Sequence, residues 1–302
     1  MRDTIVNILA RHGELGTVVP FRRVADLQND VLQLKAGKDY DACGIPWMAT
    51  DPATFVPDDL PFTPRSVIVT LSPSPRTLLH FTVQGQAVTF PLPPTYADYG
   101  RSFEIQRYLA DELGAVGYSA APAYRLPQKL LAVRGGLGLY GRNYICYSPE
   151  FGSYQLINSF FTDAPCDEAL WQPIGFLPAC ETCRACSAAC PTGALEPCRG
   201  MLNANRCLTY LNEKEGDFPP WAEKGWHNAV VGCLKCQDAC PYNLRNADRE
   251  VDLITFDEAE TDELLNHEPQ QAYTDALREK IESVNLQYYQ HLLGRNLRAL
   301  LG

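Results

Sequence analysis

Apolar and polar residues in the first half of the chain follow two different spacings, which predict strands and helices mixed within one domain. The β-branched run from Ser66 to Leu71 is typical of a buried strand, and the segments 80–83 and 87–90 predict a hairpin. Between Tyr99 and Leu113, the apolar residues recur on one face of a helix. We therefore predict an α/β domain.

The later part of the chain combines predicted helices and strands with two stretches of unusual composition. Residues 126–133 predict a helix, 144–147 and 154–161 predict two strands joined by a turn, and 276–301 predict one or two short helices. The stretch 257–268 is acidic and contains no Lys or Arg, which is typical of a solvated surface. The other unusual stretch is rich in cysteine and precedes the acidic one.

Composition and charge narrow the class of protein. The 302 residues exceed the usual length of one domain, and 46% apolar with 21% charged residues is ordinary for a globular protein. The formal net charge is -10 and no basic run is longer than a pair, so a general attraction to nucleic-acid phosphates is not expected. The sequence has no signal peptide and no apolar run of about 18 residues, so we expect a cytoplasmic protein without a membrane partner.

The chain contains twelve cysteines, and most of them fall in one short segment. In a reducing compartment, such cysteines indicate metal binding or catalysis rather than disulfides. The run from Cys180 to Pro191, CETCRACSAACP, has the C-x2-C-x2-C-x3-C-P spacing of bacterial ferredoxins. In two-cluster ferredoxins, three of these thiolates hold one [4Fe-4S] cluster and the fourth binds the other cluster. A second, looser set runs from Cys207 to Pro241.

We assign four thiolates to each of two [4Fe-4S] clusters, with one cysteine exchanged between the two sets. The proline after the last cysteine of each set favours a turn that lets the chain leave one cluster for the other. A pair of structural zinc sites is the alternative, but zinc ribbons use separated C-x2-C pairs. Cys43, Cys146, Cys166 and Cys198 stand outside this pattern and are expected to be ordinary buried or surface thiols. The first cluster would be held by Cys180, Cys183, Cys186 and Cys240, and the second by Cys190, Cys207, Cys233 and Cys236.

A glycine-rich loop, GGLGLYGRN at 135–143, follows the predicted helix. Its GxGxxG pattern between Gly136 and Gly141 is a weak match to a dinucleotide-binding fingerprint, because that fingerprint needs a strand before it and a helix after it. Here a helix precedes the loop and a strand follows it. The sequence therefore favours a tight turn approached closely by a large ligand, and a plain connection without a ligand is the alternative.

These motifs resemble the epoxyqueuosine reductase family. The stretches GLGLYGRNYICYSPEFGSY, CETCRACSAACPTGAL, RCLTYL and GCLKCQDACPYN match the family in order and spacing, over roughly residues 64–243. The resemblance implies an iron-sulfur and cobalamin enzyme related to reductive dehalogenases. In such an enzyme a cobalamin-binding α/β domain packs on a ferredoxin-like domain, and the clusters feed electrons to cobalt. An external electron donor of the flavodoxin or ferredoxin type is implied as well.

The resemblance also implies which residues of this chain face the cofactor. Gly138, Gly141, Arg142 and Asn143 would belong to a cobalamin-side loop, and Ser153 would follow in the matching Gly-Ser pair. The implied substrate is a small molecule or a modified nucleoside, with tRNA as a further candidate.

The chain departs from the family pattern at three places. The family's catalytic aspartate precedes the glycine loop, but the segment 119–123, SAAPA, contains no carboxylate, so the general acid is missing. Arg142 stands where the family has lysine, and the family's C-terminal helical-repeat domain is represented by its opening only. Tyr124, Tyr140 or Tyr144 would have to donate the proton, and the alternative is that each of them is a packing residue.

The sequence predicts an α/β (α+β) protein in three parts: an α/β domain at 1–170, a ferredoxin-like two-cluster domain at 171–250 and a helical C-terminal tail at 251–302. Our first hypothesis is an epoxyqueuosine reductase-like oxidoreductase with two [4Fe-4S] clusters and cobalamin. The second is a ferredoxin-like electron carrier or interaction module without cobalamin or catalysis. A cavity for a corrin that faces a cluster would favour the first hypothesis, and a filled core would favour the second.

Overall fold

A four-stranded sheet, ordered β1-β2-β8-β5, organises the N-terminal half of the computed structural model. All neighbouring strands in it are antiparallel, and β2 (Ser66–Pro73) and β8 (Gln155–Thr162) are the two central strands. The edge strands are β1 (Leu15–Pro20) and β5 (Ala120–Pro122). The structure describes residues 1–37, 51–97, 99–167, 170–195, 201–246, 250–267 and 272–302.

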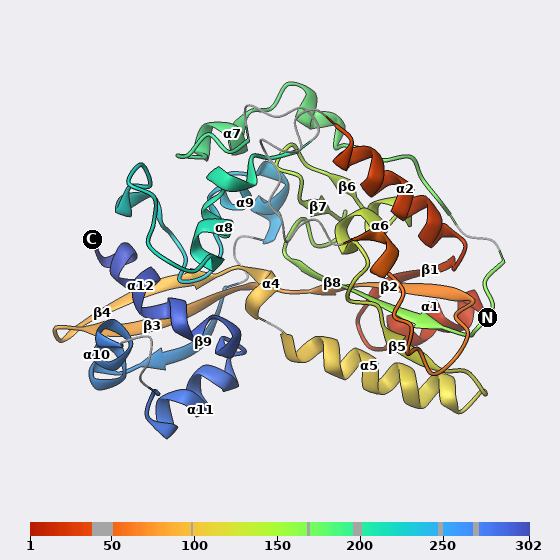
Figure 1. Cartoon of the computed structure of the whole chain (residues 1–302), viewed down its shortest axis with the longest axis horizontal. Coiled ribbons are helices and arrows are strands. Elements are labelled where there is room, and N and C mark those ends of the chain that lie inside the picture. The colour runs from red at the N-terminus through yellow and green to blue at the C-terminus, as the bar shows by residue number, and fades with distance from the viewer. Residues whose placement is uncertain (38–50, 98, 168–169, 196–200, 247–249, 268–271) are drawn as a thin grey trace.

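Helices cover both faces of this sheet (Figure 1), which explains why β2 is apolar along most of its length. Val67, Val69 and Leu71 belong to one buried cluster, whereas Ile68 belongs to another cluster on the opposite face. The strand predicted at β2 and the helices predicted at α5 and α6 are therefore confirmed. The first cluster includes residues of α2 (Arg23–Lys35) and α6 (Gln128–Arg134), and the second includes residues of α1 (Arg2–Arg11) and α5 (Tyr99–Gly114).

The two strands predicted on either side of the turn at 148–152 do not pair with each other. β7 (Cys146–Tyr147) pairs with β6 (Leu139–Tyr140), whereas β8 joins the main sheet. The two sides of the turn meet only at an isolated bridge, in which the backbone N–H groups of Ser148 and Gly152 each donate to the other's carbonyl oxygen at 3.0 Å. Gly152 adopts a φ of 61°, which reverses the chain before β8 begins.

A second unit joins a hairpin from the N-terminal half to the C-terminal segment. β3 (Arg76–Val83) pairs antiparallel with β4 (Gln86–Leu92), which confirms the predicted hairpin, and parallel with β9 (Glu250–Phe256). The segment from 251 was expected to be a helical tail, but it begins with a strand. Its sequence, EVDLITF, is rich in β-branched and aromatic residues, which favour that conformation.

Three helices pack against this small sheet and share a core with it. Phe81 and Phe256 stack at 5.0 Å between ring centroids, and Leu264 and Leu293 belong to the same buried cluster. The acidic stretch has a structural role here, because Asp257 and its partner three residues later form a capping box at the start of the first helix. Glu268, at the end of that stretch, lies outside the described residues. The helices are α10 (Glu258–Asn266), α11 (Asp275–Ser283) and α12 (Gln290–Leu301).

The cysteine-rich segment is built from short helical turns, and α7 packs against α9 within it. Figure 1 shows α7, α8 and α9 above the junction of the two units. No helix among the described residues has the length and apolar character that crossing a membrane requires. The turns are η3 (Pro178–Glu181), α7 (Ala185–Ala189), η4 (Ala204–Arg206), α8 (Leu208–Glu213), η5 (Lys224–Trp226), α9 (Lys235–Asp238) and η6 (Pro241–Asn246), and further short helices elsewhere are η2 (Pro52–Thr54), α4 (Pro94–Ala97) and η7 (Gln287–Tyr289).

Gly294 lies where α12 packs against α10, and a methyl group there would overlap the carbonyl oxygen of Leu264. We predict that Gly294→Ala lowers the free energy of unfolding by about 1–3 kcal/mol, because the two helices must separate to make room. Gly114→Ala is the control, since a methyl group at that helix end meets nothing within 4 Å. It should leave stability unchanged or raise it by about 0.4–1 kcal/mol. Denaturant titration followed by circular dichroism compares the proteins, and equal stability of all three would contradict this packing.

Candidate functional site

The cysteine-rich segment carries its predicted ligands on the short turns described above. Cys186 lies in α7 and is buried, Cys236 lies in α9, and Cys207 immediately precedes α8. All eight predicted ligands are free thiols. Cys146 and Cys166, outside the predicted framework, form no disulfide and are buried, as expected. Cys43 and Cys198 lie outside the described residues.

Electrostatic interactions divide the eight thiols into two sets. In the first set, burial raises the pKa of the Cys186 thiol, and the charges of Cys240, Cys180 and Cys183 raise it further. Cys240 comes from the far end of the segment. This set therefore contains a cysteine from the second half of the cysteine pattern.

More protein surrounds the thiols of the second, deeper set than those of the first, although each of them is partly accessible from a cavity. Burial raises the pKa of the Cys233 thiol to about 12, and the charges of Cys207 and Cys190 add to the shift. Burial also raises the pKa of the Cys236 thiol, with contributions from the charges of Cys233 and Cys207 and a smaller one from Cys186. Because Cys186 belongs to the first set, the two sets adjoin.

Four thiols that protein largely encloses are unfavourable as free thiolates but suitable as metal ligands. Water cannot solvate their charge and each thiolate repels the next, whereas coordination to a cation holds a thiol deprotonated.

Within the residues that the structure describes, no three His, Cys, Asp or Glu side chains are grouped as they would be around one metal ion. A compact zinc site is therefore not preformed there, whereas a four-iron cluster spaces its thiolates more widely than a single ion does. Which sulfur binds which iron stays a prediction.

Two arginines hold the turn between Cys180 and Cys183. Arg142, from the glycine-rich loop, donates from Nε to the carbonyl oxygen of Cys183 at 3.0 Å and from Nη2 to that of Cys180. Arg184 donates from Nη1 to the Cys183 carbonyl oxygen at 2.9 Å and to that of Glu181 at 3.1 Å. The guanidinium of Arg142 is thus engaged with the cluster segment, although the resemblance implied that it faces cobalamin.

Gly138 and Gly141 stand where neighbouring atoms leave no room for a side chain. A Cβ at Gly138 would lie 2.6 Å from the carbonyl oxygen of Tyr147 and 2.8 Å from the sulfur of Cys146. A Cβ at Gly141 would lie 2.6 Å from the Tyr147 ring and 2.7 Å from Asn143 Oδ1. The two glycines let the loop pack closely against β7.

Asn143 and Ser153 are buried and connect the α/β half to the cluster segment. Asn143 Nδ2 donates to Tyr147 Oη at 2.9 Å. The backbone N–H of Ser153 donates to Asn243 Oδ1 at 2.9 Å, and its hydroxyl donates to Gln237 Oε1 at 2.8 Å. Gln237 lies in α9, so these bonds fix the loop region relative to the turns that carry the cysteines.

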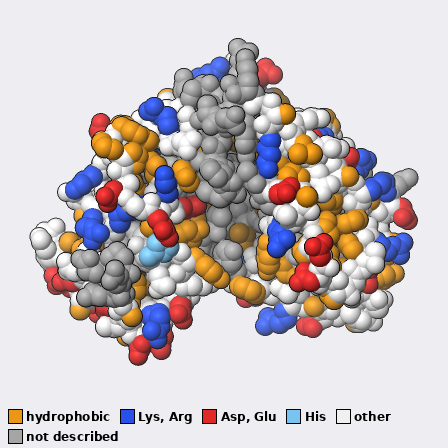
Figure 2. Space-filling view, in the orientation of Figure 1, with side chains coloured by type: hydrophobic (Ala, Val, Ile, Leu, Met, Phe, Trp, Pro, Cys, Tyr) orange, Lys and Arg blue, Asp and Glu red, His pale blue; other side chains and the backbone are white. Residues whose placement is uncertain are grey.

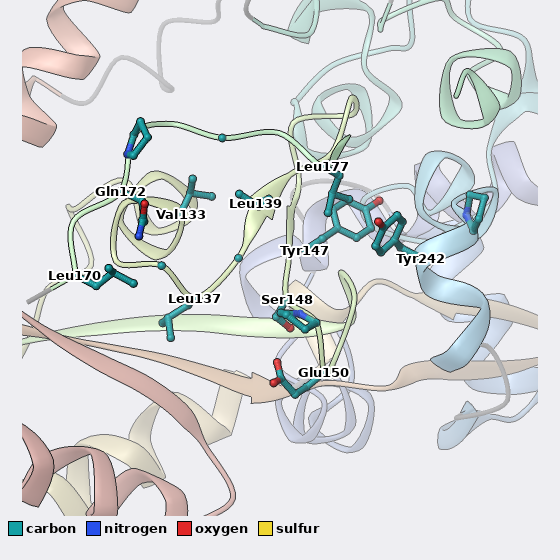
Figure 3. Close-up of a pocket in the computed structure, with 16 residues that line it drawn as sticks. Val133, Leu137, Leu139, Tyr147, Ser148, Glu150, Leu170, Gln172, Leu177 and Tyr242 are labelled. Carbon is teal, nitrogen blue, oxygen red and sulfur yellow. The ribbon is translucent and has the colours of Figure 1, made fainter. Parts of the chain in front are cut away.

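A cavity of about 670 Å³, here called the loop cavity, borders the glycine-rich loop. Leu137, Gly138 and Leu170 line it, together with Tyr147 and Tyr242. Figure 3 shows the two tyrosines near each other at one end and Leu170 at the other. Their rings meet edge-on at 6.3 Å between centroids, and Tyr242 comes two residues after the last predicted ligand. The loop cavity therefore reaches the edge of the first cysteine set.

A second cavity of about 490 Å³ lies between the α/β half and the cysteine-rich segment. Asn143 and Ser153 line it, whereas Gly138 lines the loop cavity and Gly141 and Arg142 line neither. The residues that the resemblance assigned to one cofactor face are therefore divided among three environments. We call this second space the cluster-facing cavity, because its wall includes all four thiols of the deeper set, Cys190, Cys207, Cys233 and Cys236.

Lys129, from the start of α6, lines the cluster-facing cavity. Its side chain is accessible to water, as expected for a group on the wall of an open cavity. Burial lowers the pKa of Lys129, and the charges of Cys207, Cys146 and Cys236 oppose that change. The cavity thus places a cation beside the deeper cysteine set.

Glu213, at the end of α8, lines the same cavity. Tyr96 Oη donates a hydrogen bond to Glu213 Oε1, and the Tyr96 ring packs edge-on against Tyr289 at 5.5 Å between centroids. Burial raises the pKa of Glu213 by more than the Tyr96 hydrogen bond lowers it. Burial and the charge of Glu213 raise the pKa of Tyr96, so Tyr96 remains a neutral donor.

The three tyrosines considered as proton donors do not line the cluster-facing cavity. Tyr124 is 62% exposed. Tyr140 and Tyr144 pack against Phe176, with ring centroids at 5.8 and 6.0 Å. The ring contacts of Tyr140 and Tyr144 favour the packing interpretation, whereas the exposure of Tyr124 does not.

Lys129 and Glu213 were not singled out from the sequence. Lys129 stands among the apolar residues of an ordinary short helix. Glu213 begins a charged stretch, EKEGD, that is typical of a solvent-exposed surface. Neither residue belongs to a motif, and only the fold brings both to one cavity. No local signal in the sequence would have found them.

Charged side chains of both signs are interspersed on the face shown in Figure 2. Together with the net charge of -10, this distribution gives that face no continuous basic surface of the kind typical of nucleic-acid binding.

Comparison with known proteins connects this geometry to a family. Residues 179–243 match the model of the 4Fe-4S double cluster binding domain. The epoxyqueuosine reductase of Bacillus subtilis is 36% identical over 119 residues, covering 39% of this chain and 29% of the relative. That of Staphylococcus aureus is 31% identical over 168 residues, covering 52% and 43%. The chain therefore spans less than half the length of these curated relatives.

Solved structures of epoxyqueuosine reductases share the fold. A selenomethionine-labelled epoxyqueuosine reductase has a TM-score of 0.66 at 20% identity, over 99% of this chain and 80% of that one. The Bacillus subtilis structure has a TM-score of 0.65 at 21% identity, over 95% and 76%. A third, with an epoxyqueuosine-modified tRNA stem loop, has a TM-score of 0.63 at 21% identity, over 95% and 76%.

These likenesses first define the class: the chain is a mixed α/β protein that carries a 4Fe-4S double-cluster domain. The predicted fold class is thereby confirmed. Within that class, the chain is related to the epoxyqueuosine reductases, which confirms the resemblance that its motifs indicated.

The hydrogen bonds of Arg142 predict that this residue slows the loss of iron from the first cysteine set. In Arg142→Gln, the carbonyl oxygens of Cys180 and Cys183 lose charged donors, so the turn that carries these ligands loosens. We expect iron to be lost to a chelator on the order of tenfold faster than in the unchanged protein. Arg125→Gln is the control, because its only described hydrogen bond is a long one, 3.4 Å, to Thr54. Equal rates of iron loss in both variants, followed by absorbance under anaerobic conditions, would rule out this role for Arg142.

Proposed function

We propose that the chain is an iron-sulfur oxidoreductase of the epoxyqueuosine reductase type. Two [4Fe-4S] clusters would carry electrons from an external flavodoxin- or ferredoxin-type donor to a reaction site in the cluster-facing cavity. The observation that carries the proposal is that four thiols of one set line a cavity bordered by the α/β half. An open cavity beside a cluster allows a bound acceptor to be reduced, whereas a filled core would not.

The proposed ligands follow the exchange of one cysteine between the two halves of the pattern. The mutual electrostatic interactions of the thiols support this grouping, because Cys240 acts on Cys186 while Cys190 and Cys207 act on Cys233. The first cluster is held by Cys180, Cys183, Cys186 and Cys240, and the second by Cys190, Cys207, Cys233 and Cys236.

Cobalamin is the further cofactor we propose for the cluster-facing cavity. Asn143 and Ser153 are the loop residues placed to contact it, and Lys129 adds a cation to the same wall. When bound, cobalamin supplies a low-valent cobalt centre that can reduce a substrate. Cavities of roughly 300–1,000 Å³ hold drug-sized ligands. Because cobalamin is larger than such ligands, a cavity of about 490 Å³ would enclose only part of it.

The substrate class we propose is a modified nucleoside, either free or within tRNA. A structural neighbour is described with an epoxyqueuosine-modified tRNA stem loop, which supports this class. The net charge of -10 argues that any nucleic acid would be bound through local contacts rather than through a general electrostatic attraction.

A second candidate function is an electron carrier without cobalamin. Two observations favour it: the segment 119–123 contains no carboxylate, and the loop residues Gly141 and Arg142 are engaged by the protein itself. In this case the clusters would pass electrons to a partner protein.

Anaerobic purification tests the cluster proposal. We predict about eight irons per chain, with the absorbance and electron paramagnetic resonance of [4Fe-4S] clusters. Cys236→Ala should lose about four irons, because one ligand of the second cluster is removed. Cys166→Ala should keep all of them, since this buried thiol bonds to Val18 away from the cysteine-rich segment. Zinc in place of iron would contradict the proposal.

Titration with cobalamin separates the two candidate functions. If the enzyme proposal is correct, adding cobalamin under anaerobic conditions changes its visible spectrum and raises the thermal unfolding temperature of the protein. Replacing Ser153 with Ala should weaken binding by about threefold to tenfold, through loss of a hydroxyl on the cavity wall. Gly114→Ala serves again as the distant control. An unchanged spectrum and an unchanged unfolding temperature would favour the carrier.

A further inference from the structure

Glu213 is a partly buried carboxyl group that no step proposed above uses. It lies at the end of α8, and Cys207, a proposed ligand of the second cluster, immediately precedes the same helix. Six residues at 1.5 Å each place the two about 9 Å apart along the helix axis. Both residues line the cluster-facing cavity, so Glu213 faces the space in which an acceptor would be reduced.

Tyr96 holds Glu213 in place, and no ion pair of Glu213 is found among the described residues; Arg295, from α12, donates instead to the carbonyl oxygens of Leu211 and Asn212, just before Glu213. Tyr96, from α4, donates a hydrogen bond to Glu213 Oε1, and Tyr289, from η7, packs on the Tyr96 ring. Lys129 from α6 and Lys235 from α9 line the same cavity. The charges of Cys207, Cys146 and Cys236 act on Lys129, whereas Glu213 is governed by burial and by Tyr96. Besides these groups, the described ionisable residues in the wall are the cysteines Cys146, Cys190, Cys207, Cys233 and Cys236.

Reduction of the second cluster would change the proton affinity of Glu213. Burial already favours the neutral carboxylic acid over the carboxylate. An added negative charge on the second cluster disfavours the carboxylate further; at a separation of about 9 Å the effect is on the order of tenfold in the proton-binding constant. A proton from solvent would then accompany the electron that enters the cluster.

We propose that Glu213 is the proton donor of the cluster-facing cavity and takes up its proton when the second cluster is reduced. This inference rests on the proposed function, because it needs the second cluster to be present. One electron from the external donor and one proton from solvent enter the cluster and Glu213 together. Both then pass to an acceptor A bound in the cavity, which becomes AH, while the cluster returns to its oxidised state and Glu213 to its carboxylate. A second round gives AH2.

The segment 119–123 of the α/β half contains no carboxylate, and Glu213 would act as the proton donor from the cysteine-rich segment instead. The family's aspartate belongs to the α/β domain, whereas Glu213 belongs to the cluster segment and stands next to the electron source. Tyr96 is a positioning residue, since its hydrogen bond fixes the carboxyl group and favours the carboxylate after proton transfer. The acceptors that suit such a site are oxidised small molecules that gain electrons and protons in equal number.

Redox titration of the clusters at several pH values between about 6 and 9 tests this proposal without a substrate. Dithionite is the reductant, and electron paramagnetic resonance reports each cluster. In the unchanged protein, the midpoint potential of the second cluster should become more negative as pH rises through the window between the pKa values of Glu213 in the oxidised and reduced states. In Glu213→Gln, this potential should not depend on pH.

Three further variants separate proton uptake from structural damage. Glu213→Asp keeps a carboxyl group and should keep the pH dependence. Tyr96→Phe removes a hydrogen bond that lowers the pKa of Glu213, so the window should move to higher pH. Glu215→Gln changes a carboxylate whose side chain is 85% exposed and should behave like the unchanged protein. Iron analysis of each variant shows whether its clusters are intact.

Two results would overturn the inference: a potential that does not change with pH in the unchanged protein, or a pH dependence that persists in Glu213→Gln. Infrared difference spectra of the reduced and oxidised protein give an independent measurement, because the carbonyl stretch of a protonated Glu213 should appear on reduction and be missing in Glu213→Gln. If the unchanged protein holds no iron, the proposed function itself fails. If it holds both clusters and no proton is taken up, only the role of Glu213 fails.

Discussion

Burial of neighbouring thiols is the constraint on which the rest of the structure depends. The thiols of Cys233 and Cys236 are so enclosed that their thiolate forms are strongly disfavoured, and each nearby thiolate adds repulsion. Without a cation such groups stay protonated, whereas a bound cation offsets both effects and holds them as thiolates. The helices α7 and α9, which carry Cys186 and Cys236, are too short to be stable in isolation. Their order must therefore come from the bound metal and from contacts with the neighbouring units.

The α/β half supplies many of those contacts through its glycine-rich loop and the start of β8. Arg142 binds carbonyl groups of the first turn, while Ser153 bonds to Gln237 in α9. The loop can approach so closely because Gly138 and Gly141 have no side chains to collide with β7. As a result, the part of the α/β half that was expected to contact a cofactor also fixes the cysteine turns. A change in this loop would act on the clusters as well as on any ligand in the cavities.

Elements whose structure is determined by a local pattern of residues could be predicted from the sequence. The run from Ser66 to Leu71 is apolar because helices cover both faces of β2, and such a run is visible without coordinates. Elements and site residues that depend on contacts between distant parts of the chain could not be predicted. The strand β9 was assigned to a helical tail because its partner, β3, lies about 170 positions earlier in the chain. Lys129 and Glu213 were missed for the same reason, since only tertiary packing makes them neighbours of one cavity.

The same desolvation that disfavours free thiolates acts on Lys129 and Glu213 in the wall of the cluster-facing cavity. It lowers the pKa of Lys129 and raises that of Glu213, so both groups are pushed toward their neutral forms. In such a space an electron cannot arrive alone without leaving a charge that water does not solvate. A carboxyl group with a raised pKa resolves this, because it takes up a proton when the negative charge appears. Tyr96 keeps that carboxyl group oriented through its hydrogen bond. The cavity is therefore suited to reactions in which electrons and protons move together, whichever acceptor it holds.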